Sequence, residues 1–190
     1  MRKNLRINPC VFPMPVMLVA TYSDDEEPDI MTVTWGGICT KYFDKIVLNI
    51  DSFHRTAKNI VNRGAFTVAI PDASQREAVD YLGCVSADDV KDKVAKSGFH
   101  VIKSEFIDAP VIFELPVSIE CRVIDIRRHD MLCVTGQIIN VSADEKFLDD
   151  QGEFIPEKMN VLVYEQYQNK YFALGESLGN AVKFSHNQIK

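Results

Sequence analysis

One short stretch carries the side chains best suited to binding an anion. It reads Ser52-Phe53-His54-Arg55-Thr56, with Lys58 two positions later, and so combines hydroxyls, an imidazole and two cations. An apolar run typical of a strand, 46–50, precedes it, and a short helix is predicted over 56–62. The first amide groups of a helix have no acceptor within it, and the helix dipole places positive partial charge there. We therefore predict a phosphate-binding loop between this strand and this helix.

A second predicted strand, 30–35, supplies the other half of the site. It reads Ile30-Met31-Thr32-Val33-Thr34-Trp35, ends on the only tryptophan of the chain and is followed by the pair Gly36-Gly37. The two segments together indicate a phosphorylated ligand with a flat aromatic part.

The composition is typical of one soluble domain over residues 1–190. With 46% hydrophobic residues the chain can bury one sizeable core, and no shift in composition divides it. A net charge of −6 argues against nucleic acid, because such binding depends on Lys and Arg neutralising phosphates. Pro13 and Pro15 interrupt the N-terminal apolar run and argue against a signal peptide, and no run is long enough to span a membrane. We expect a cytoplasmic protein.

Cysteine and histidine spacing gives no sign of a metal or disulfide framework. The five cysteines are odd in number and include no C-x-x-C pair, and the four histidines are scattered along the chain. We predict a reduced protein without a bound metal.

The hydrophobic pattern predicts a mainly β protein with inserted helices. Strands are expected at 16–22, 30–35, 46–50, 65–70, from 115 with a slip of phase at 124–126, and at 131–141, 161–164 and 171–174. Helices are expected at 56–62, from Ser74 as N-cap to Tyr81, and at 90–96, while 175–184 is predicted as either helix or loop. Strands joined by short turns, without a G-x-G-x-x-G motif, favour a closed antiparallel barrel over a doubly wound sheet.

Several short motifs, in order, resemble the flavin reductase-like family of FMN-binding split barrels, and within it the flavoredoxin-like members. They are Pro13-x-Pro15, Met31-Thr32-x-x-Trp35-Gly36-Gly37, Thr56-x-x-Asn59-Ile60 followed by Ala65-Phe66-Thr67-Val68, Ser86-x-x-Asp89-Val90-x-Asp92-Lys93 ahead of Gly98-Phe99, Leu115-Pro116 with Glu120-Cys121, and Tyr171-Phe172-x-x-Gly175-x-x-Leu178-Gly179. The resemblance covers nearly the whole chain.

This resemblance implies a Greek-key antiparallel barrel that forms a homodimer and binds FMN without a covalent bond. The isoalloxazine ring would lie against Met31, Thr32, Val33, Thr34 and Trp35, with backbone N–H groups as far as Cys39 available to it. The phosphate would be held by Ser52, His54, Arg55 and Thr56, with Phe53 among the cofactor-binding residues of the same stretch, and the ring side would be closed by Ser86 and Lys93. The chain departs from the family pattern at Asp51, Ala87 and Asp88. The phosphate charge must then be met by Arg55, His54 or Lys58.

Each of these residues also has a purely structural interpretation. Trp35 could be core, Thr56 could be the helix N-cap, and Arg55 and Lys58 could be solvated. Lys93 could belong to a charged helical face with Lys91 and Lys96. Cys39 and Cys84 could be small buried hydrophobes.

The function expected from the resemblance is an FMN-containing oxidoreductase that moves electrons from NAD(P)H or a protein donor to flavin or a partner protein. A flavin supplies its own redox chemistry, so no catalytic residues need be found. One alternative is a flavoredoxin-like electron carrier with no nicotinamide turnover. Another is a barrel that has lost the flavin and acts through its dimer interface.

Overall fold

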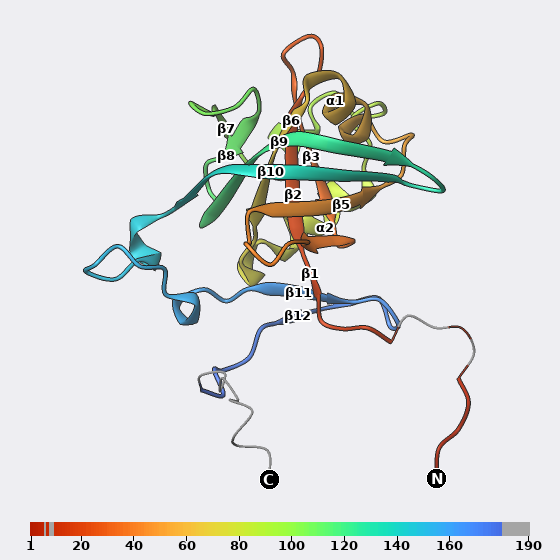
Figure 1. Ribbon diagram of the computed structural model, residues 1–190, viewed down its shortest axis with the longest axis vertical. Helices are drawn as coiled ribbons and strands as arrows, with labels where there is room; N and C mark the ends of the chain where they lie inside the picture. Colours follow the sequence, from red (N-terminus) through yellow and green to blue (C-terminus); the bar gives the residue numbers. More distant parts are fainter. Residues whose placement is uncertain (6, 8–9, 180–190) are drawn as a thin grey trace.

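The computed structural model describes residues 1–5, 7 and 10–179. Its centre is a seven-stranded sheet in which all neighbouring strands are antiparallel. In sheet order the strands are β3 (Pro28–Val33), β2 (Met17–Tyr22), β6 (Ala65–Ile70), β9 (Val117–Arg128), β10 (Leu132–Ala143), β5 (Lys45–Ile50) and β4 (Gly36–Ile38). The sheet is strongly curled: Figure 1 shows β9, β10 and β5 running across the direction of β2 and β3.

The barrel is split, not closed, and the split creates one of the pockets described below. β3 and β4 are the two ends of the sheet and are not hydrogen-bonded to each other. Residues 34 and 35 connect them, and the Asn49 N–H donates to the Trp35 carbonyl at 2.8 Å, which extends the pairing of β5 with β4 by one residue. The strand pattern alone predicted closure; the family resemblance correctly implied a split barrel.

Helices cover the curled sheet and bring the site residues to it. They are α1 (Arg55–Arg63), α2 (Arg76–Cys84) and α3 (Lys93–Ser97), with 3₁₀ turns at η1 (Ala73–Gln75), η2 (Glu145–Phe147) and η3 (Pro156–Lys158). Two small sheets accompany them, one of β1 (Met14–Pro15), β11 (Leu162–Glu165) and β12 (Lys170–Ala173), the other of β7 (Val101–Lys103) and β8 (Pro110–Ile112). No helix among residues 1–5, 7 and 10–179 is long and apolar enough to cross a membrane.

The core consists of two large apolar clusters that share the central strands and a small third one of Ala65, Ile107 and Ala109. Successive residues of a strand face opposite sides of the sheet, so Val19 of β2 lies in one cluster and Leu18 in the other. Ile60 of α1 packs in the first cluster, and Leu82 of α2 packs in the second. The two helices therefore cover different regions of the core, and the N-terminus of α1 and the C-terminus of α2 both reach the main cleft described below.

Three predicted boundaries were wrong for reasons of capping and pairing. α1 begins at Arg55 with His54 as its N-cap, so Thr56 is not the cap. The helix expected from Ser74 begins as a 3₁₀ turn capped by Asp72, whose side chain accepts the Ser74 N–H and whose own N–H donates to Gln75. The helix expected over 90–96 is displaced to 93–97.

The strand predictions were better, because burial in the longer strands alternates or is continuous. Strand 65–70 was predicted with the observed bounds, and the predicted slip at 124–126 is a register shift in the pairing of β9 with β10. The strand expected over 30–35 ends at Val33, and Gly36 and Gly37 belong to β4, which was not predicted. Strands β1, β7 and β8 were also missed; residues 175–179 form no helix, and 180–184 lie outside the described residues.

Candidate functional site

The largest concentration of predicted site residues lines a cleft of about 410 Å³ between α1, the end of α2 and the start of β3. We call it the main cleft. It is lined by Asp29, Met31, Phe53, His54, Arg55, Thr56, Leu82, Gly83, Cys84, Val85, Ser86, Ala87, Asp88, Asp89 and Lys93. Its volume is in the range of small-molecule binding sites.

The N-terminus of α1 opens into this cleft with unpartnered amide groups. His54 has extended backbone angles (φ −62°, ψ 143°), and its side chain does not cap the helix. The first helical hydrogen bond runs from the Lys58 N–H to the His54 carbonyl at 3.2 Å, so the amides of residues 55–57 precede the helical ladder. No acidic residue lies in the first turn. The local field there favours an anion.

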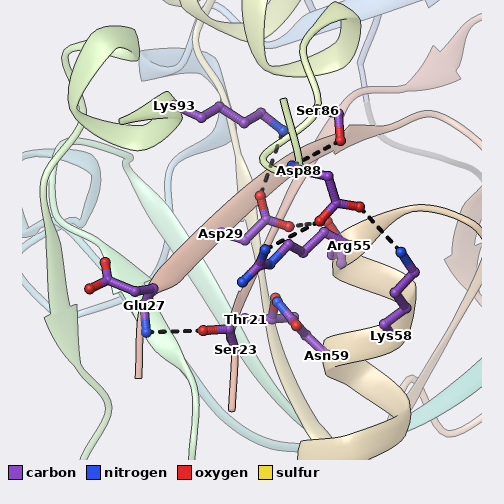
Figure 2. A network of polar contacts seen from close by, with 11 residues as sticks. Thr21, Ser23, Glu27, Asp29, Arg55, Lys58, Asn59, Ser86, Asp88 and Lys93 are labelled. Atoms are coloured by element: carbon purple, nitrogen blue, oxygen red, sulfur yellow. Dashed lines mark hydrogen bonds and ion pairs between the residues drawn. The ribbon is translucent and has the colours of Figure 1, made fainter. Parts of the chain in front are cut away.

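Beneath the cleft, one buried carboxylate connects three elements (Figure 2). Asp29 of β3 accepts a hydrogen bond from the Thr56 hydroxyl of α1 at 2.5 Å, and its Oδ1 lies 3.7 Å from the Lys93 Nζ of α3. The Asp29 and Lys93 side chains are 3% and 4% exposed, and Asp29 Oδ1 has no hydrogen-bond partner among the residues that the structure describes. Burial lowers the pKa of Lys93, and the neighbouring Asp29 opposes that shift.

At the mouth of the cleft, Asp88 bridges the two cations of α1. Its carboxylate accepts from Arg55 and from Lys58, each at 3.2 Å, as Figure 2 shows. The hydrogen bond from Lys58 is the largest cause that lowers the pKa of Asp88, and the one from Arg55 adds to it. We call this arrangement the Asp88 bridge.

A second hollow of about 130 Å³ lies in the split of the barrel, and we call it the adjoining pocket. Its lining comes from the end of β3 and the end of β5: Met31, Thr32, Val33, Thr34, Trp35, Asn49, Ile50, Asp51, His54 and Met131. Met31 and His54 line both hollows, so the two lie side by side. Because β3 is an edge strand, alternate backbone groups along it are not used by the sheet and can face a ligand.

The environment of His54 favours its neutral form. The ring packs against Phe53 with centroids 4.4 Å apart. Its pKa is lowered mainly by burial, while Asp51 acts in the opposite direction. A phosphate placed beside it would raise that pKa.

Comparison with known proteins identifies the family. The model of a family described as flavin reductase like domain matches residues 10–173. The chain belongs to this family. Flavoredoxin of Desulfovibrio vulgaris (Miyazaki F) is 33% identical and superposes with a TM-score of 0.90, covering 99% of this chain and 100% of that one. Flavoredoxin from Methanosarcina acetivorans is 27% identical with a TM-score of 0.86, covering 98% and 99%. No curated protein sequence matches the chain.

More distant members of known structure share the fold. The 2-nitrobenzoate 2-nitroreductase of Pseudomonas fluorescens is 20% identical with a TM-score of 0.80, covering 93% of this chain and 88% of that one. The flavin reductase-like fold is therefore established for this chain, and membership of this family supports flavin binding.

The two hollows fit the two ends of a flavin nucleotide. The unpartnered amides of α1 and Arg55 suit a phosphate, and the edge of β3 with Trp35 suits a planar ring that carries hydrogen-bonding atoms. Trp35 is 41% exposed, so the core interpretation was wrong for it. Its indole N–H donates to Gln166 at 3.4 Å, in the turn between β11 and β12.

Most of the predicted residues come together, and two do not. Eleven of the thirteen line the main cleft, the adjoining pocket or both; Ser52 and Cys39 line neither. The Cys39 N–H already donates to the Lys45 carbonyl at 3.1 Å. The buried interpretation of Cys39 and Cys84 was wrong, since both side chains are exposed. The solvated interpretation of Lys93 was also wrong.

Asp29 and the end of α2 were not predicted as parts of the site. Asp29 follows a charged turn and was placed just outside the predicted strand, whereas it is buried inside β3. Gly83 and Cys84 line the main cleft because α2 extends beyond Tyr81, where the prediction ended it. A carboxylate directly before the predicted apolar strand was the only signal for Asp29. In the part of the chain that the structure describes, no group of His, Cys, Asp or Glu is arranged to hold a metal.

Proposed function

We propose that this protein binds FMN without a covalent bond, its phosphate in the main cleft and its ring in the adjoining pocket, and acts as a flavin reductase-type oxidoreductase. The observation that carries the proposal is that the two hollows adjoin each other and share Met31 and His54 as lining residues. One end offers unpartnered helix amides and a guanidinium, and the other offers a free strand edge and an exposed indole.

The chain's own residues would bind and orient the cofactor. Arg55 and the amides of residues 55–57 would hold the phosphate, and backbone N–H groups of β3 would meet the ring's polar edge. Lys93 would keep a positive charge beneath the cleft, where its pKa is lowered by burial. A bound flavin supplies the redox chemistry itself. The electron source proposed for it is NAD(P)H or a protein donor, and the acceptor is flavin or a partner protein.

The first experiment asks whether FMN binds and whether Arg55 holds its phosphate. Flavin-free protein is titrated with FMN and with riboflavin, which lacks the phosphate, and flavin fluorescence is followed. Arg55→Gln should lower the affinity for FMN about tenfold or more, which corresponds to the loss of one charge-assisted hydrogen bond, and should change the affinity for riboflavin by less than about twofold. Arg76→Gln is the matched control, because Arg76 is an exposed arginine on α2 and does not line the cleft.

Two results would contradict the proposal. One is the absence of saturable flavin binding by the wild-type protein. The other is an equal loss of FMN and riboflavin affinity in Arg55→Gln, which would remove the phosphate from the main cleft.

The 33% identity with a flavoredoxin over 99% of the chain favours a second candidate, an electron carrier that does not turn over nicotinamides. Anaerobic mixing of the flavin-loaded protein with NADH and with NADPH separates the two. Rapid bleaching of the flavin band supports the reductase, whereas reduction only by a low-potential protein donor supports the carrier.

We also propose that the protein is a homodimer, as the family resemblance implies. An open barrel leaves sheet edges that a twofold-related partner can cover. Sedimentation at micromolar concentration tests this, and a single monomeric species would refute it.

A further inference from the structure

The cations of the proposed phosphate site are already paired with carboxylates. Lys93 lies 3.7 Å from Asp29, and Arg55 and Lys58 each lie 3.2 Å from Asp88. A further carboxylate, Asp89, also lines the main cleft. Within the described residues, the positive charges at this site are therefore balanced by carboxylates before any dianion binds.

Asp88 is held in place by the turn that carries it. Its N–H donates to the Ser86 hydroxyl at 3.1 Å, and the N–H groups of Asp89 and Val90 donate to the Ser86 carbonyl. The turn follows directly on α2, whose last backbone hydrogen bond runs from the Val85 N–H to the Tyr81 carbonyl. Seven residues after Ser86, the buried Lys93 anchors the other end. The Asp88 bridge thus joins an anchored turn to the first turns of α1 across the mouth of the cleft.

The bridge uses the same donor that a phosphate would use. Arg55 lines the cleft at the N-terminus of α1, and its guanidinium is about one third exposed. A phosphate that bound there would have to share Arg55 with the Asp88 carboxylate or displace it. A displaced Asp88 would stay on its turn, close to a ligand of the same sign of charge.

We propose that Asp88 is a specificity-determining residue that competes with the ligand phosphate for Arg55 and Lys58 and so reduces the preference for phosphorylated over unphosphorylated flavin. The inference rests on the proposed function, since it assumes that flavins bind in the main cleft. It also implies that the Asp88 bridge and a bound phosphate weaken each other at Arg55.

A structural role for Asp88 makes the opposite prediction. If the carboxylate merely orders Arg55 for the phosphate, its removal leaves the guanidinium less organised and FMN binds more weakly. If it competes, removal frees two cations and FMN binds more tightly. The sign of the change therefore separates the two roles.

The test compares Asp88→Asn with the matched control Asp89→Asn. Both remove one carboxylate from the same turn and the same cleft, but Asp89 has no ion pair with Arg55 or Lys58 in the described structure. Affinities for FMN and riboflavin are measured by quenching of flavin fluorescence at low and at moderate salt. Asp88→Asn should tighten FMN about fivefold to tenfold and change riboflavin less than about twofold, because surface charge pairs of this kind are modest in energy.

Two further readouts sharpen the result. The FMN gain in Asp88→Asn should shrink as salt is added, since it arises from charge. Asp89→Asn should change the FMN affinity by less than half of the change that Asp88→Asn causes. Thermal unfolding of both variants without flavin checks that they fold, and Asp88→Ser repeats the test if the asparagine disturbs the turn.

The competing role is overturned if Asp88→Asn lowers the affinity for FMN or leaves it unchanged. It is also overturned if Asp88→Asn raises the affinity for riboflavin as much as that for FMN, or if Asp89→Asn raises the FMN affinity equally. In each of these cases FMN still binds, so the proposed function survives. If neither flavin binds the wild-type protein or any variant, the proposed function fails and this inference fails with it.

Discussion

Replacing Lys93 by methionine is the most direct test of the buried charge network beneath the cleft. Methionine keeps an unbranched apolar stem and removes only the ammonium group. Asp29 would then remain buried with one hydrogen bond, from Thr56, and no cation. Removing one partner of a buried pair costs about 3–5 kcal/mol, and the 3.7 Å separation places this pair near the lower end, at about 3 kcal/mol.

A double-mutant cycle shows whether the cost comes from the stranded charge. Asp29→Asn alone leaves Lys93 buried without its partner and should cost a similar amount. The double variant Lys93→Met with Asp29→Asn strands no charge, and asparagine can still accept from Thr56, so its cost should be about 1 kcal/mol. The double variant should thus be more stable than either single one.

The assay is urea unfolding followed by far-ultraviolet circular dichroism, with the slope m checked for constancy. Lys96→Met, an exposed lysine on the same helix, should change the unfolding free energy by less than about 0.5 kcal/mol. The reasoning fails if Lys93→Met costs under about 1 kcal/mol, or if the two single costs simply add in the double variant.

The same variant carries a pH signature. Because burial lowers the pKa of Lys93 in the folded protein, the unfolded chain binds the extra proton between that lowered pKa and the ordinary value of 10.5. The unfolding free energy of the wild-type protein should therefore increase as pH rises through this window, because the unfolded state binds more protons than the folded state there. Lys93→Met lacks that gain, so its deficit relative to wild type should widen at alkaline pH.

Three other predictions follow from contacts near the site. A Cβ on Gly36 would lie 2.5 Å from the Val47 carbonyl oxygen, so Gly36→Ala should lower the unfolding free energy by about 1–3 kcal/mol in urea, whereas Gly175→Ala, in open space, should cost far less. Since burial lowers the pKa of His54, the unfolded chain is protonated first as pH falls through 6.5; the wild type should lose stability between pH 7 and 5 relative to His54→Gln, and equal losses would contradict this. Trp35 emission should fall during FMN titration with the midpoint given by flavin fluorescence, and unchanged emission would place the ring elsewhere.

Elements whose burial alternates or is continuous could be predicted from the sequence. Strand 65–70 is buried along almost its whole length and was predicted with the observed bounds. In β9 the apolar residues that alternate from Val117 located the strand, but Ser118 and Glu120 between them are buried as well, so the pattern did not show that both faces are covered there. Strand β4 has only three residues, two of them glycine, so it has no side-chain pattern to detect.

The charged part of the site could be predicted in its residue types but not in its pairings. Lys93 stands in a run with Lys91 and Lys96 that resembles a solvated helical face. Only the fold places it against Asp29, from a segment far away in the chain. Asp88 and Lys58 are 30 positions apart, and nothing local indicates that they meet. Hydrophobic period reports which face of an element is buried, and it carries no information on which distant charge lies opposite.

Asp29 contacts or adjoins the parts of the protein that are proposed to bind the two ends of the ligand. It lies in β3, whose later residues line the adjoining pocket, and it accepts from Thr56 in the first turn of α1, where the phosphate is proposed to bind. One carboxylate thus fixes the helix N-terminus relative to the strand edge, with Lys93 of α3 as the counter-charge. The separation of the two subsites depends on this network because the two segments share no backbone pairing. A variant that breaks the network without unfolding the protein should therefore weaken a ligand spanning both hollows more than riboflavin, which lacks the phosphate.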